Sequence, residues 1–172
     1  MMPHTTLDAH QIAPKLWMGA APPLGLLLAS HGFDILVLCA KEYQPPTEWF
    51  PGVEVARVHL SDNGRTPFSA QDAFSAFQVA SQLAKCIKFG RRALVTCWEG
   101  RNRSGLVTAL TLTQLTGCSG VEACCAVRAR RIARKGPALV NQEFVDALSV
   151  IPAAQVRGTV TRNAAMAAGL PG

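Results

Sequence analysis

The sequence predicts an α/β fold: a single domain with a mostly parallel central sheet flanked by helices. Strand-like and helical segments alternate along the chain, which is the order found in such folds. Residues 34–39 form a continuous apolar run, as expected for a strand covered on both faces. A chain of 172 residues has the length of one domain with one core, and it contains no internal repeat.

The composition is that of a compact protein. Hydrophobic residues make up 49% of the chain and charged residues 16%, which excludes a disordered chain. No apolar run approaches the roughly 20 residues needed to cross a bilayer. The first residues lack the basic and apolar regions of an export signal. The expected location is therefore the cytoplasm.

The charge and the cysteines narrow the range of partners and cofactors. The net charge of +6 favours anionic partners, such as phosphoproteins, inositol lipids or nucleic acid. The six cysteines are expected to be reduced thiols, since no export signal accompanies them. No Cys-x-x-Cys pair or Cys/His cluster has zinc spacing, so we expect no metal and no cofactor.

The first part of the chain supplies an arm and the first elements. Residues 1–12 are polar and predict a loose N-terminal arm, which precedes a domain expected over residues 13–151. Residues 15–19 predict a short strand. Two prolines then favour a short helix over residues 24–30. After the buried strand, three prolines predict a loop over residues 43–51.

The middle of the chain is predicted to form a strand, a loop and a helix. Partial alternation of apolar and polar residues favours a strand over residues 53–60. Residues 61–67 contain many turn-forming residues and predict a loop. Ser69 and Asp72 have the spacing of a capping box at the start of a helix that ends near Lys88. The apolar stripe of this helix is expected to consist of Phe74, Phe77, Ala80, Leu83, Ala84 and Ile87.

The last part of the chain is predicted to be mainly helical. Residues 93–97 are apolar and rich in strand formers. Residues 104–116 are apolar nearly all round, which predicts a buried central helix. Further helices are expected over residues 119–131 and 141–150. Residues 152–172 mix Pro, Gly and Ala without periodicity, which favours a flexible C-terminal tail.

The chemistry is concentrated where the strand at residues 93–97 turns into the next helix. Such a turn leaves the first N–H groups of the helix unpaired, and with the helix dipole they form an anion site. Gly100 and Gly105 permit a tight backbone path. The same N–H groups would stabilise Cys97 as a thiolate, and Arg103 adds a planar pair of donors for phosphate oxygens. The pattern predicts a cysteine nucleophile that attacks a bound phosphate.

The same two glycines have the spacing of a nucleotide-binding Walker A loop. That loop requires Lys followed by Ser or Thr, and this chain has Leu106 and Val107 at those positions. We therefore exclude nucleotide hydrolysis by this route.

The run CWEGRNRS, from Cys97 to Ser104, resembles the signature loop of the cysteine-based protein tyrosine phosphatases. It is closest to their dual-specificity branch, which commonly has an acidic residue and then glycine at the positions of Glu99 and Gly100. The resemblance implies a protein tyrosine phosphatase-like fold. The chain departs from the pattern at Thr96, where the family usually has a His that orders the loop through hydrogen bonds.

The resemblance also implies a role for each residue in register. Cys97 would be the nucleophile and Arg103 would hold the phosphate oxygens. The hydroxyl of Ser104 would help the thiolate to leave in the second step. The rest of the phosphate-binding loop would be Trp98, Glu99, Gly100, Arg101 and Asn102.

A phosphate ester needs an acid that protonates its leaving oxygen, and Asp62 is the candidate. It follows a strand in a turn-rich loop, which could close over substrate. In the resembling family the acid is an Asp on this loop, and Asp62 matches that position. The alternative is a turn aspartate that accepts hydrogen bonds from backbone N–H groups.

Three residues of the loop have more than one interpretation. Glu99 is expected to orient Arg103, with simple exposure to solvent as the alternative. Trp98 is either a wall for an aromatic substrate or a surface side chain. A basic residue at the position of Arg101 occurs in phosphoinositide phosphatases of the same superfamily, which leaves a lipid substrate open.

Two features follow the phosphate-binding loop. A group of basic residues suits the negative end of a helix dipole, and its alternative role is to attract phosphorylated substrate. This basic cluster consists of Arg128, Arg130, Arg131, Arg134 and Lys135. Asn141 and Phe144 resemble the family's Asn-x-x-Phe, which we interpret as structural support.

Together these observations predict phosphomonoester hydrolysis through a phosphocysteine intermediate, without a metal. The expected substrate is a phosphorylated protein carrying phosphotyrosine, with phosphoserine and phosphothreonine left open. One alternative is a phosphoinositide or RNA 5′-phosphate phosphatase of the same superfamily. The other is a pseudophosphatase that only binds phosphorylated partners, because Thr96 replaces the ordering His.

Overall fold

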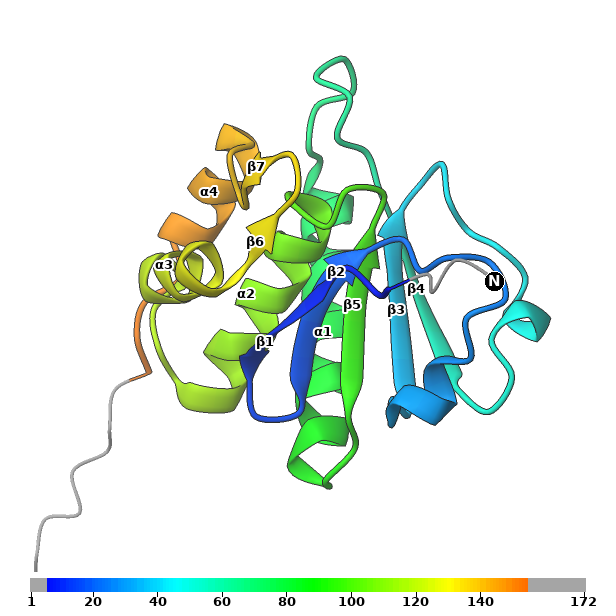
Figure 1. The fold of residues 1–172 in the computed structure, drawn as a ribbon. Coiled ribbons are helices and arrows are strands. Elements are labelled where there is room, and N and C mark those ends of the chain that lie inside the picture. The colour runs from blue at the N-terminus through cyan, green and yellow to red at the C-terminus, as the bar shows by residue number, and fades with distance from the viewer. Residues whose placement is uncertain (1–5, 155–172) are drawn as a thin grey trace, which may run out of the picture.

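The centre of the fold is a five-stranded sheet (Figure 1). The computed structural model describes residues 6–154. The strands lie in the order β1-β2-β5-β3-β4, and all neighbours are parallel except β1 and β2. The sheet is therefore mostly parallel, as predicted. The strands are β1 Ala9–Ala13, β2 Leu16–Ala20, β3 Ile35–Ala40, β4 Glu54–Leu60 and β5 Ala93–Cys97.

Strand β5 occupies the middle of the sheet, between β2 and β3. Every residue of β3 and β5 is buried, as expected for parallel strands covered on both faces. The carboxyl ends of parallel strands meet at one edge of a sheet, where α/β folds hold their ligands. Cys97 ends β5 and therefore lies at this edge, beside the loops that follow β3 and β4.

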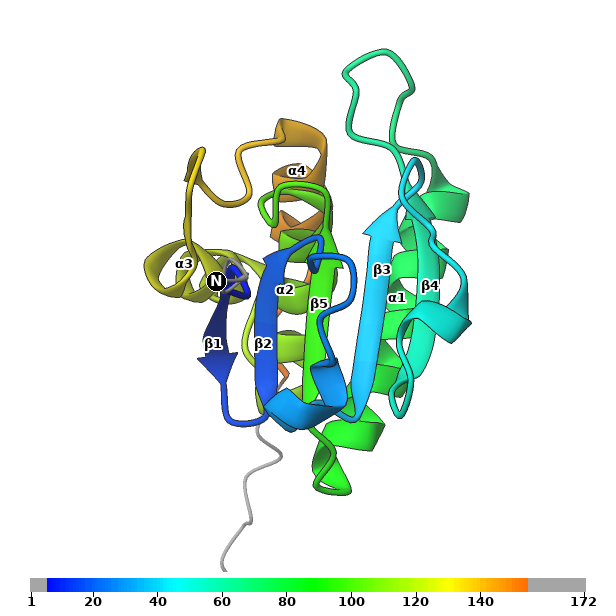
Figure 2. The ribbon, with the colours of Figure 1, turned by 45° about the vertical axis from the view of Figure 1, so that its right-hand side comes forward.

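Helices cover one face of the sheet (Figures 1 and 2). Helices α1 and α2 pack against the strands and against each other, and α2 is buried from Arg103 to Thr113. Helices α3 and α4 pack beside α2. The helices are α1 Ala70–Lys88, α2 Arg103–Thr116, α3 Gly120–Arg130 and α4 Gln142–Ser149.

The other face of the sheet carries a second, smaller core. The segments around β3 that connect it to β2 and β4 supply Leu28, Phe33 and Phe50 to this core. These segments contain two short 3₁₀ helices, η1 Leu28–His31 and η2 Thr47–Trp49. The short helix predicted over residues 24–30 is thus reduced to η1. Leu27 at its N-cap has no side chain that can accept a backbone hydrogen bond there.

Capping boxes fix the start of two helices. The backbone N–H of Asp72 donates to Ser69 Oγ at 3.1 Å, and the Ser69 N–H donates to the Asp72 carboxylate at 3.0 Å. This confirms the capping box predicted for α1. Ser119 and Glu122 make the same pair of bonds at the start of α3.

The predicted arm over residues 1–12 is shorter than expected. Its end forms strand β1, whose residue Ile12 is only 1% exposed. Burial of this one apolar side chain and pairing with β2 outweigh the polar composition of the segment. Residues 152–154 have no helix or strand, and the rest of the predicted tail over residues 152–172 lies outside the described residues.

The apolar stripe predicted for α1 is partly wrong. Ala80, Leu83, Ala84 and Ile87 are buried, but Phe74 and Phe77 are 55% and 43% exposed. A stripe counted at every third residue drifts by about 60° per step around a helix. The drift carries the two phenylalanines away from the buried face.

A small hairpin follows α3 and was not predicted. Its strands are β6 Ile132–Ala133 and β7 Gly136–Pro137, joined by Arg134 and Lys135. Gly136 has φ of +111°, a conformation that residues with side chains rarely adopt. The hairpin lies between α3 and α4 in the chain and stands beside both helices in the fold (Figure 1).

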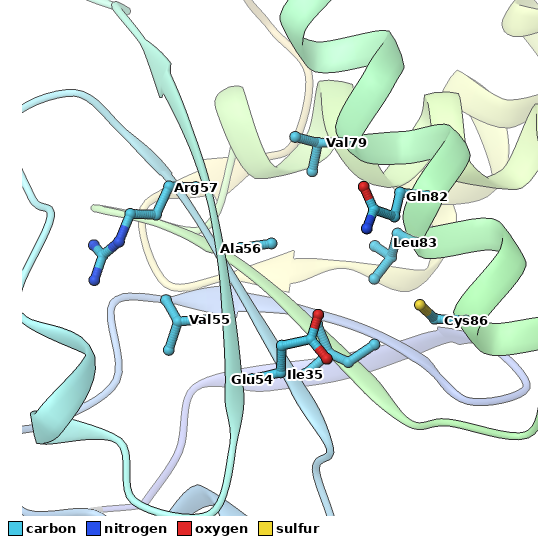
Figure 3. A pocket seen from close by; sticks show the side chains of 9 residues that line it. All are labelled: Ile35, Glu54, Val55, Ala56, Arg57, Val79, Gln82, Leu83 and Cys86. Atoms are coloured by element: carbon cyan, nitrogen blue, oxygen red, sulfur yellow. The ribbon is translucent and has the colours of Figure 1, made fainter.

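A pocket of about 300 Å³ lies at the open edge of the sheet, between β4 and α1 (Figure 3). Val79, Gln82, Leu83 and Cys86 project into it from α1. No residue of the loop between β5 and α2 lines this pocket. Within the described part of the chain, no helix is long and apolar enough to cross a membrane.

Candidate active site

The chain between β5 and α2 forms a tight loop at the carboxyl edge of the sheet (Figure 1). Gly100 has φ of +64°, and a Cβ atom built on it would lie 2.5 Å from the backbone nitrogen of Ala20. The loop therefore requires glycine at this position. The Leu106 N–H makes the first helical bond, to the Asn102 carbonyl at 2.8 Å, so the earlier N–H groups of α2 have no helical partner.

Cys97 and Ser104 are brought together at the two ends of this loop. Cys97 Sγ lies 3.2 Å from Ser104 Oγ, and the two residues are 4% and 0% exposed. A hydroxyl at this distance can donate a hydrogen bond to a thiolate. The structure therefore places in contact the two residues that the sequence predicts to be the nucleophile and its assisting hydroxyl.

Thr96 directs its hydroxyl away from the loop. Its Oγ1 donates to the Val37 carbonyl of the neighbouring strand at 3.0 Å, and the residue is 1% exposed. This bond ties β5 to β3 within the sheet. The ordering of the loop therefore rests on other residues than the one before the cysteine.

Arg103 is held by a carboxylate that the sequence analysis did not find. Arg103 Nη1 donates to Glu42 Oε1 at 2.6 Å and to Oε2 at 2.5 Å, and it lies 3.4 Å from the Leu60 carbonyl oxygen. Glu42 follows β3, at the same edge of the sheet. The expectation that Glu99 orients Arg103 is wrong, because Glu42 occupies that role.

The charges around Arg103 reinforce its cationic form. Burial alone would lower the pKa of Arg103, but the hydrogen bond to Glu42 and the nearby Cys97, Glu42 and Asp62 outweigh it and raise this pKa. The hydrogen bond from Arg103 in turn lowers the pKa of Glu42. Arg103 is 7% exposed, and its Nε is buried without a hydrogen-bond partner among the described residues. A buried donor of this kind is the expected partner of an anion.

Asp62 lies at the mouth of the loop, fixed by two amides. Its Oδ2 accepts from Asn102 Nδ2 at 3.0 Å and its Oδ1 accepts from Asn141 Nδ2 at 2.7 Å. Asn102 belongs to the loop and Asn141 is the N-cap of α4. The structure therefore brings Asp62 together with the loop between β5 and α2, and it places the asparagine of the Asn-x-x-Phe motif beside both.

A pocket of about 630 Å³ opens beside these residues. It lies between the loop that follows β3 and the loop that follows β4, with Arg103 on its wall. Its lining residues are Lys41, Glu42, Ser61, Asp62, Asn63, Thr66 and Arg103.

An aromatic pair borders the loop on the side of β3. The rings of Trp98 and Tyr43 meet edge to face, with centroids 5.5 Å apart. The Trp98 carbonyl accepts from the Ala21 N–H at 3.4 Å, and its side chain is 54% exposed. An exposed ring at this position can contact a substrate.

Basic residues border the loop on the side of the β6–β7 hairpin. Glu99 pairs with Lys135 at 2.8 Å and with Arg101 at 3.5 Å, rather than with Arg103. The hydrogen bond from Lys135, with the charges of both cations, lowers the pKa of Glu99. Arg101 Nε also donates to the Pro137 carbonyl at 3.1 Å.

Arg131 binds the backbone of the loop between β5 and α2 from the end of α3. It is 1% exposed, and its Nε donates to the Gly100 carbonyl at 2.9 Å. Its Nη1 lies 2.7 Å from Asp8 Oδ1 and 2.8 Å from His10 Nδ1. The bond to Gly100 therefore fixes a backbone carbonyl of the loop between β5 and α2.

The basic cluster predicted at residues 128–135 is therefore divided. Arg128 donates to the Leu139 carbonyl at 2.6 Å, and Arg130 donates to the Ile12 carbonyl. Both lie in the last turn of α3, as the dipole explanation expects, and with Arg131 they also donate hydrogen bonds to acceptors inside the protein. Arg134 and Lys135 stay 74% and 67% exposed.

Sequence reasoning missed four residues around the site. Glu42 lies two residues after the end of a buried strand, and a carboxylate in that place is a usable signal for the carboxyl edge of the sheet. Asn141 carried a motif signal, but its contact with Asp62 was not foreseen. Asp8 gives no signal, because it lies in a polar segment of the sequence. Arg131 stands out there only as a member of the basic cluster, and its contacts with Asp8 and Gly100 depend on the fold. Among residues 6–154, no cluster of His, Cys, Asp and Glu side chains is suited to a metal ion.

The sheet, with a buried cysteine at its carboxyl edge and a tight loop before α2, is a fold that solved structures share. The chain has the fold of the cysteine-based protein tyrosine phosphatases, in a dual-specificity phosphatase-like form. No protein-family model and no curated protein sequence matches the chain.

Several solved structures carry this conclusion. Human DUSP28 is 26% identical over 83% of this chain and 91% of that protein, with a TM-score of 0.67. A mouse putative dual specificity phosphatase complexed with zinc tungstate is 24% identical over 86% and 88%, with a TM-score of 0.68. PTPMT1 in complex with PI(5)P is 22% identical over 82% and 92%, with a TM-score of 0.67.

Proposed function

We propose that the chain is a cysteine-dependent phosphatase that hydrolyses phosphomonoesters on proteins, with phosphotyrosine as its main substrate and phosphoserine or phosphothreonine as further ones. The observation that carries the proposal is the contact between buried Cys97 and Ser104 at the start of α2, beside the unpaired Nε of buried Arg103. This arrangement combines a nucleophile with an anion site. The similarity to human DUSP28 supports the same function.

In the first step the thiolate of Cys97 attacks phosphorus in line with the ester oxygen. A sulfur–phosphorus bond forms as the phosphorus–oxygen ester bond breaks. The loop N–H groups and Arg103 hold the three equatorial oxygens while charge develops on them. Asp62, fixed by Asn102 and Asn141, gives its proton to the leaving oxygen.

In the second step water attacks the phosphocysteine. Asp62, now a carboxylate, takes a proton from the water, and the sulfur–phosphorus bond breaks. The hydroxyl of Ser104, 3.2 Å from the sulfur, donates a hydrogen bond to the thiolate as it leaves. The products are inorganic phosphate and the regenerated Cys97 thiolate.

A phosphoinositide is a second candidate substrate. PTPMT1 in complex with PI(5)P shares the fold, and Arg101 stands on the rim of the loop together with Lys135. An RNA 5′-phosphate is a weaker candidate that rests on the net charge of +6. The Thr96 hydroxyl bond to Val37 leaves room for a pseudophosphatase, which binds a phosphorylated partner without turnover.

The catalytic domain in this proposal spans residues 13–151 and is extended by the start of β1 at Ala9. The proposed location is the cytoplasm. All six cysteines are free thiols, which is typical of proteins in a reducing compartment.

The direct test measures phosphate release from a phosphotyrosine peptide without added metal. The wild type should release phosphate, and Cys97→Ser should reduce the rate by at least about a thousandfold while still binding the peptide, since it lacks the nucleophile. The matched control is Cys125→Ser, which removes an exposed thiol of α3 and should leave the rate unchanged. Equal rates for wild type and Cys97→Ser would exclude the phosphocysteine mechanism.

A further inference from the structure

We propose that Arg101 and the β6–β7 hairpin form a subsite for a second anionic group of the substrate, namely an acidic side chain beside the phosphotyrosine of a peptide. The inference rests on the proposed phosphatase function and specifies the substrate of that same site. It concerns Arg101, Arg134 and Lys135, which we call the basic rim.

The hairpin is held in a fixed position relative to Cys97. Arg101 Nε donates to the Pro137 carbonyl at 3.1 Å, and the Leu139 N–H donates to the Arg101 carbonyl at 3.2 Å. Lys135 Nζ lies 2.8 Å from Glu99 Oε1. Glu99 and Arg101 belong to the phosphate-binding loop, so the hairpin and the loop form one unit. A group bound at the hairpin is thereby placed at a defined distance from the scissile phosphate.

The basic rim carries more positive charge than its neighbours neutralise. Glu99 faces both Arg101 and Lys135, and Asp8 faces both Arg131 and Arg134. The three cations of the basic rim and Arg131 together face two carboxylates, so the group keeps a net charge of two positive charges. The side chains of Arg134 and Lys135 are 74% and 67% exposed, so the uncompensated charge faces the solvent beside the loop.

The surroundings of the rim favour a peptide over a lipid headgroup. Ile132 and Val140 stand on either side of the basic turn in the sequence, and they are 74% and 48% exposed. On the other side of the loop, the Trp98–Tyr43 pair offers aromatic surface to a phosphotyrosine ring. A peptide can supply an aromatic ring, apolar side chains and a carboxylate together, whereas a headgroup is polar throughout.

The test compares three phosphotyrosine peptides that differ only at the two residues on either side of the phosphotyrosine, which are all Glu, all Gln or all Lys. For the wild type, kcat/KM should be about fivefold higher for the Glu peptide than for the Gln peptide, and lower still for the Lys peptide. The Glu preference should shrink as salt is added, because salt screens exposed charges.

The informative variant is the double substitution Arg134→Gln and Lys135→Gln. For this variant, the ratio of kcat/KM for the Glu peptide to kcat/KM for the Gln peptide should approach one. A general loss of activity lowers both values equally and leaves this ratio unchanged. The matched control is Lys15→Gln with Lys85→Gln, which removes two exposed cations near the opposite edge of the sheet from Cys97. This control should keep the wild-type ratio.

Three results would overturn the proposal: a wild-type ratio near one, a ratio that the Arg134/Lys135 variant retains, or an equal loss of ratio in the control. A fourth uses soluble inositol bisphosphate. The wild type could hydrolyse inositol bisphosphate faster than inositol monophosphate, with a preference that is lost in the Arg134/Lys135 variant. If the Glu-to-Gln ratio for peptides is unchanged in that variant, the basic rim binds a headgroup and not a peptide.

Failure of the phosphatase function gives a different pattern from failure of the subsite. An active phosphatase without the subsite hydrolyses para-nitrophenyl phosphate but does not discriminate among the peptides. An inactive protein hydrolyses none of these substrates. In that case the Glu-to-Gln ratio is measured as peptide affinity by fluorescence anisotropy, and a ratio near one overturns the subsite there too.

Discussion

Asp62 is oriented by side chains before any substrate binds. Each of its carboxylate oxygens accepts one amide hydrogen bond, from Asn102 and from Asn141. One amide belongs to the phosphate-binding loop and the other caps α4, so the carboxylate is fixed relative to Cys97. The proposed proton donor is therefore held against the loop by two hydrogen bonds without a bound substrate.

Replacement of this carboxyl group should reveal its role through the leaving group. Asp62→Asn keeps the size of the side chain but removes proton transfer, so kcat for a phosphotyrosine peptide should fall by about a hundredfold. The loss should be much smaller for para-nitrophenyl phosphate, whose leaving group departs without a proton. Steady-state kinetics on both substrates checks this, with the exposed Asp146→Asn as control. Equal losses on both substrates would assign Asp62 a structural role.

Glu42 holds Arg103 through hydrogen bonds at 2.6 and 2.5 Å, and we propose that it positions this arginine. Glu42→Gln retains an acceptor but removes the charge that both Nη1 contacts use. We expect kcat to fall by about tenfold, because a misplaced arginine stabilises the transition state less well. Inorganic phosphate should bind at least as tightly, since a repelling carboxylate is gone.

The split between kcat and phosphate affinity distinguishes positioning from simple damage to the site. Kinetics on a phosphotyrosine peptide gives kcat, and competitive inhibition gives the affinity for phosphate. Glu48→Gln, an exposed change in η2, should match the wild type in both. A raised KM with an unchanged kcat would contradict the positioning role of Glu42.

At the scale of elements, β1 and α3 cooperate beneath the phosphate-binding loop. Asp8 precedes β1 and Arg131 follows α3, and their ion pair at 2.7 Å lies under the Gly100 carbonyl that Arg131 holds. Burial alone would raise the pKa of Asp8, but the hydrogen bond and charge of Arg131 outweigh it, so this pKa is lowered. The pair therefore adds stability only while Asp8 is ionised.

This contribution has a definite pH dependence. A lowered folded-state pKa gives stability that is present above the pKa of the unfolded chain, about 4, and is lost as the pH falls through the folded value. Asp8→Asn should lower the free energy of unfolding by about 2 to 3 kcal/mol at neutral pH, because it leaves Arg131 buried without its carboxylate. The difference from wild type should shrink below about pH 4.

Urea unfolding at neutral pH and at about pH 3 measures both values. Asp146→Asn should differ little from the wild type at either pH, because its side chain is exposed on α4. A deficit of Asp8→Asn that stays constant down to pH 3 would mean that its cause is lost packing and not lost charge.

At the scale of the whole molecule, the sequence is informative where the relevant residues are adjacent. Cys97 and Ser104 lie within one run of eight residues, so their spacing alone predicts a shared loop. The mostly parallel sheet follows from the alternation of strands and helices. The capping box of α1 is equally local, because its two residues are one helical turn apart.

The contacts between residues far apart in the sequence depend on which strands are neighbours in the sheet. Glu42 reaches Arg103 because β3 and β5 are neighbours, and Asp8 reaches Arg131 because α3 packs on β1. The sequence predicts strands but does not state which of them are adjacent. The sequence favours Glu99 as the partner of Arg103 because both belong to one loop, whereas the fold places Glu42 against Arg103.

The ion pairs of Arg103 and Arg131 also affect how the candidate site loses its structure in denaturants. Glu42–Arg103 and Asp8–Arg131 hold the phosphate-binding loop from its two sides, while Thr96 bonds only within the sheet. Guanidinium ions compete with arginine side chains for carboxylates, whereas urea is uncharged. Activity in guanidinium chloride should therefore disappear at concentrations well below those that unfold the sheet. In urea, activity and fold should be lost together.

Parallel titrations of activity and circular dichroism in the two denaturants would reveal this difference, with sodium chloride at matched ionic strength as the control for screening and anion inhibition. Coincident loss of activity and structure in both denaturants would contradict it. If the difference is found, inactivation precedes unfolding in this protein, and a preparation can retain its full secondary structure after its active site has been disassembled.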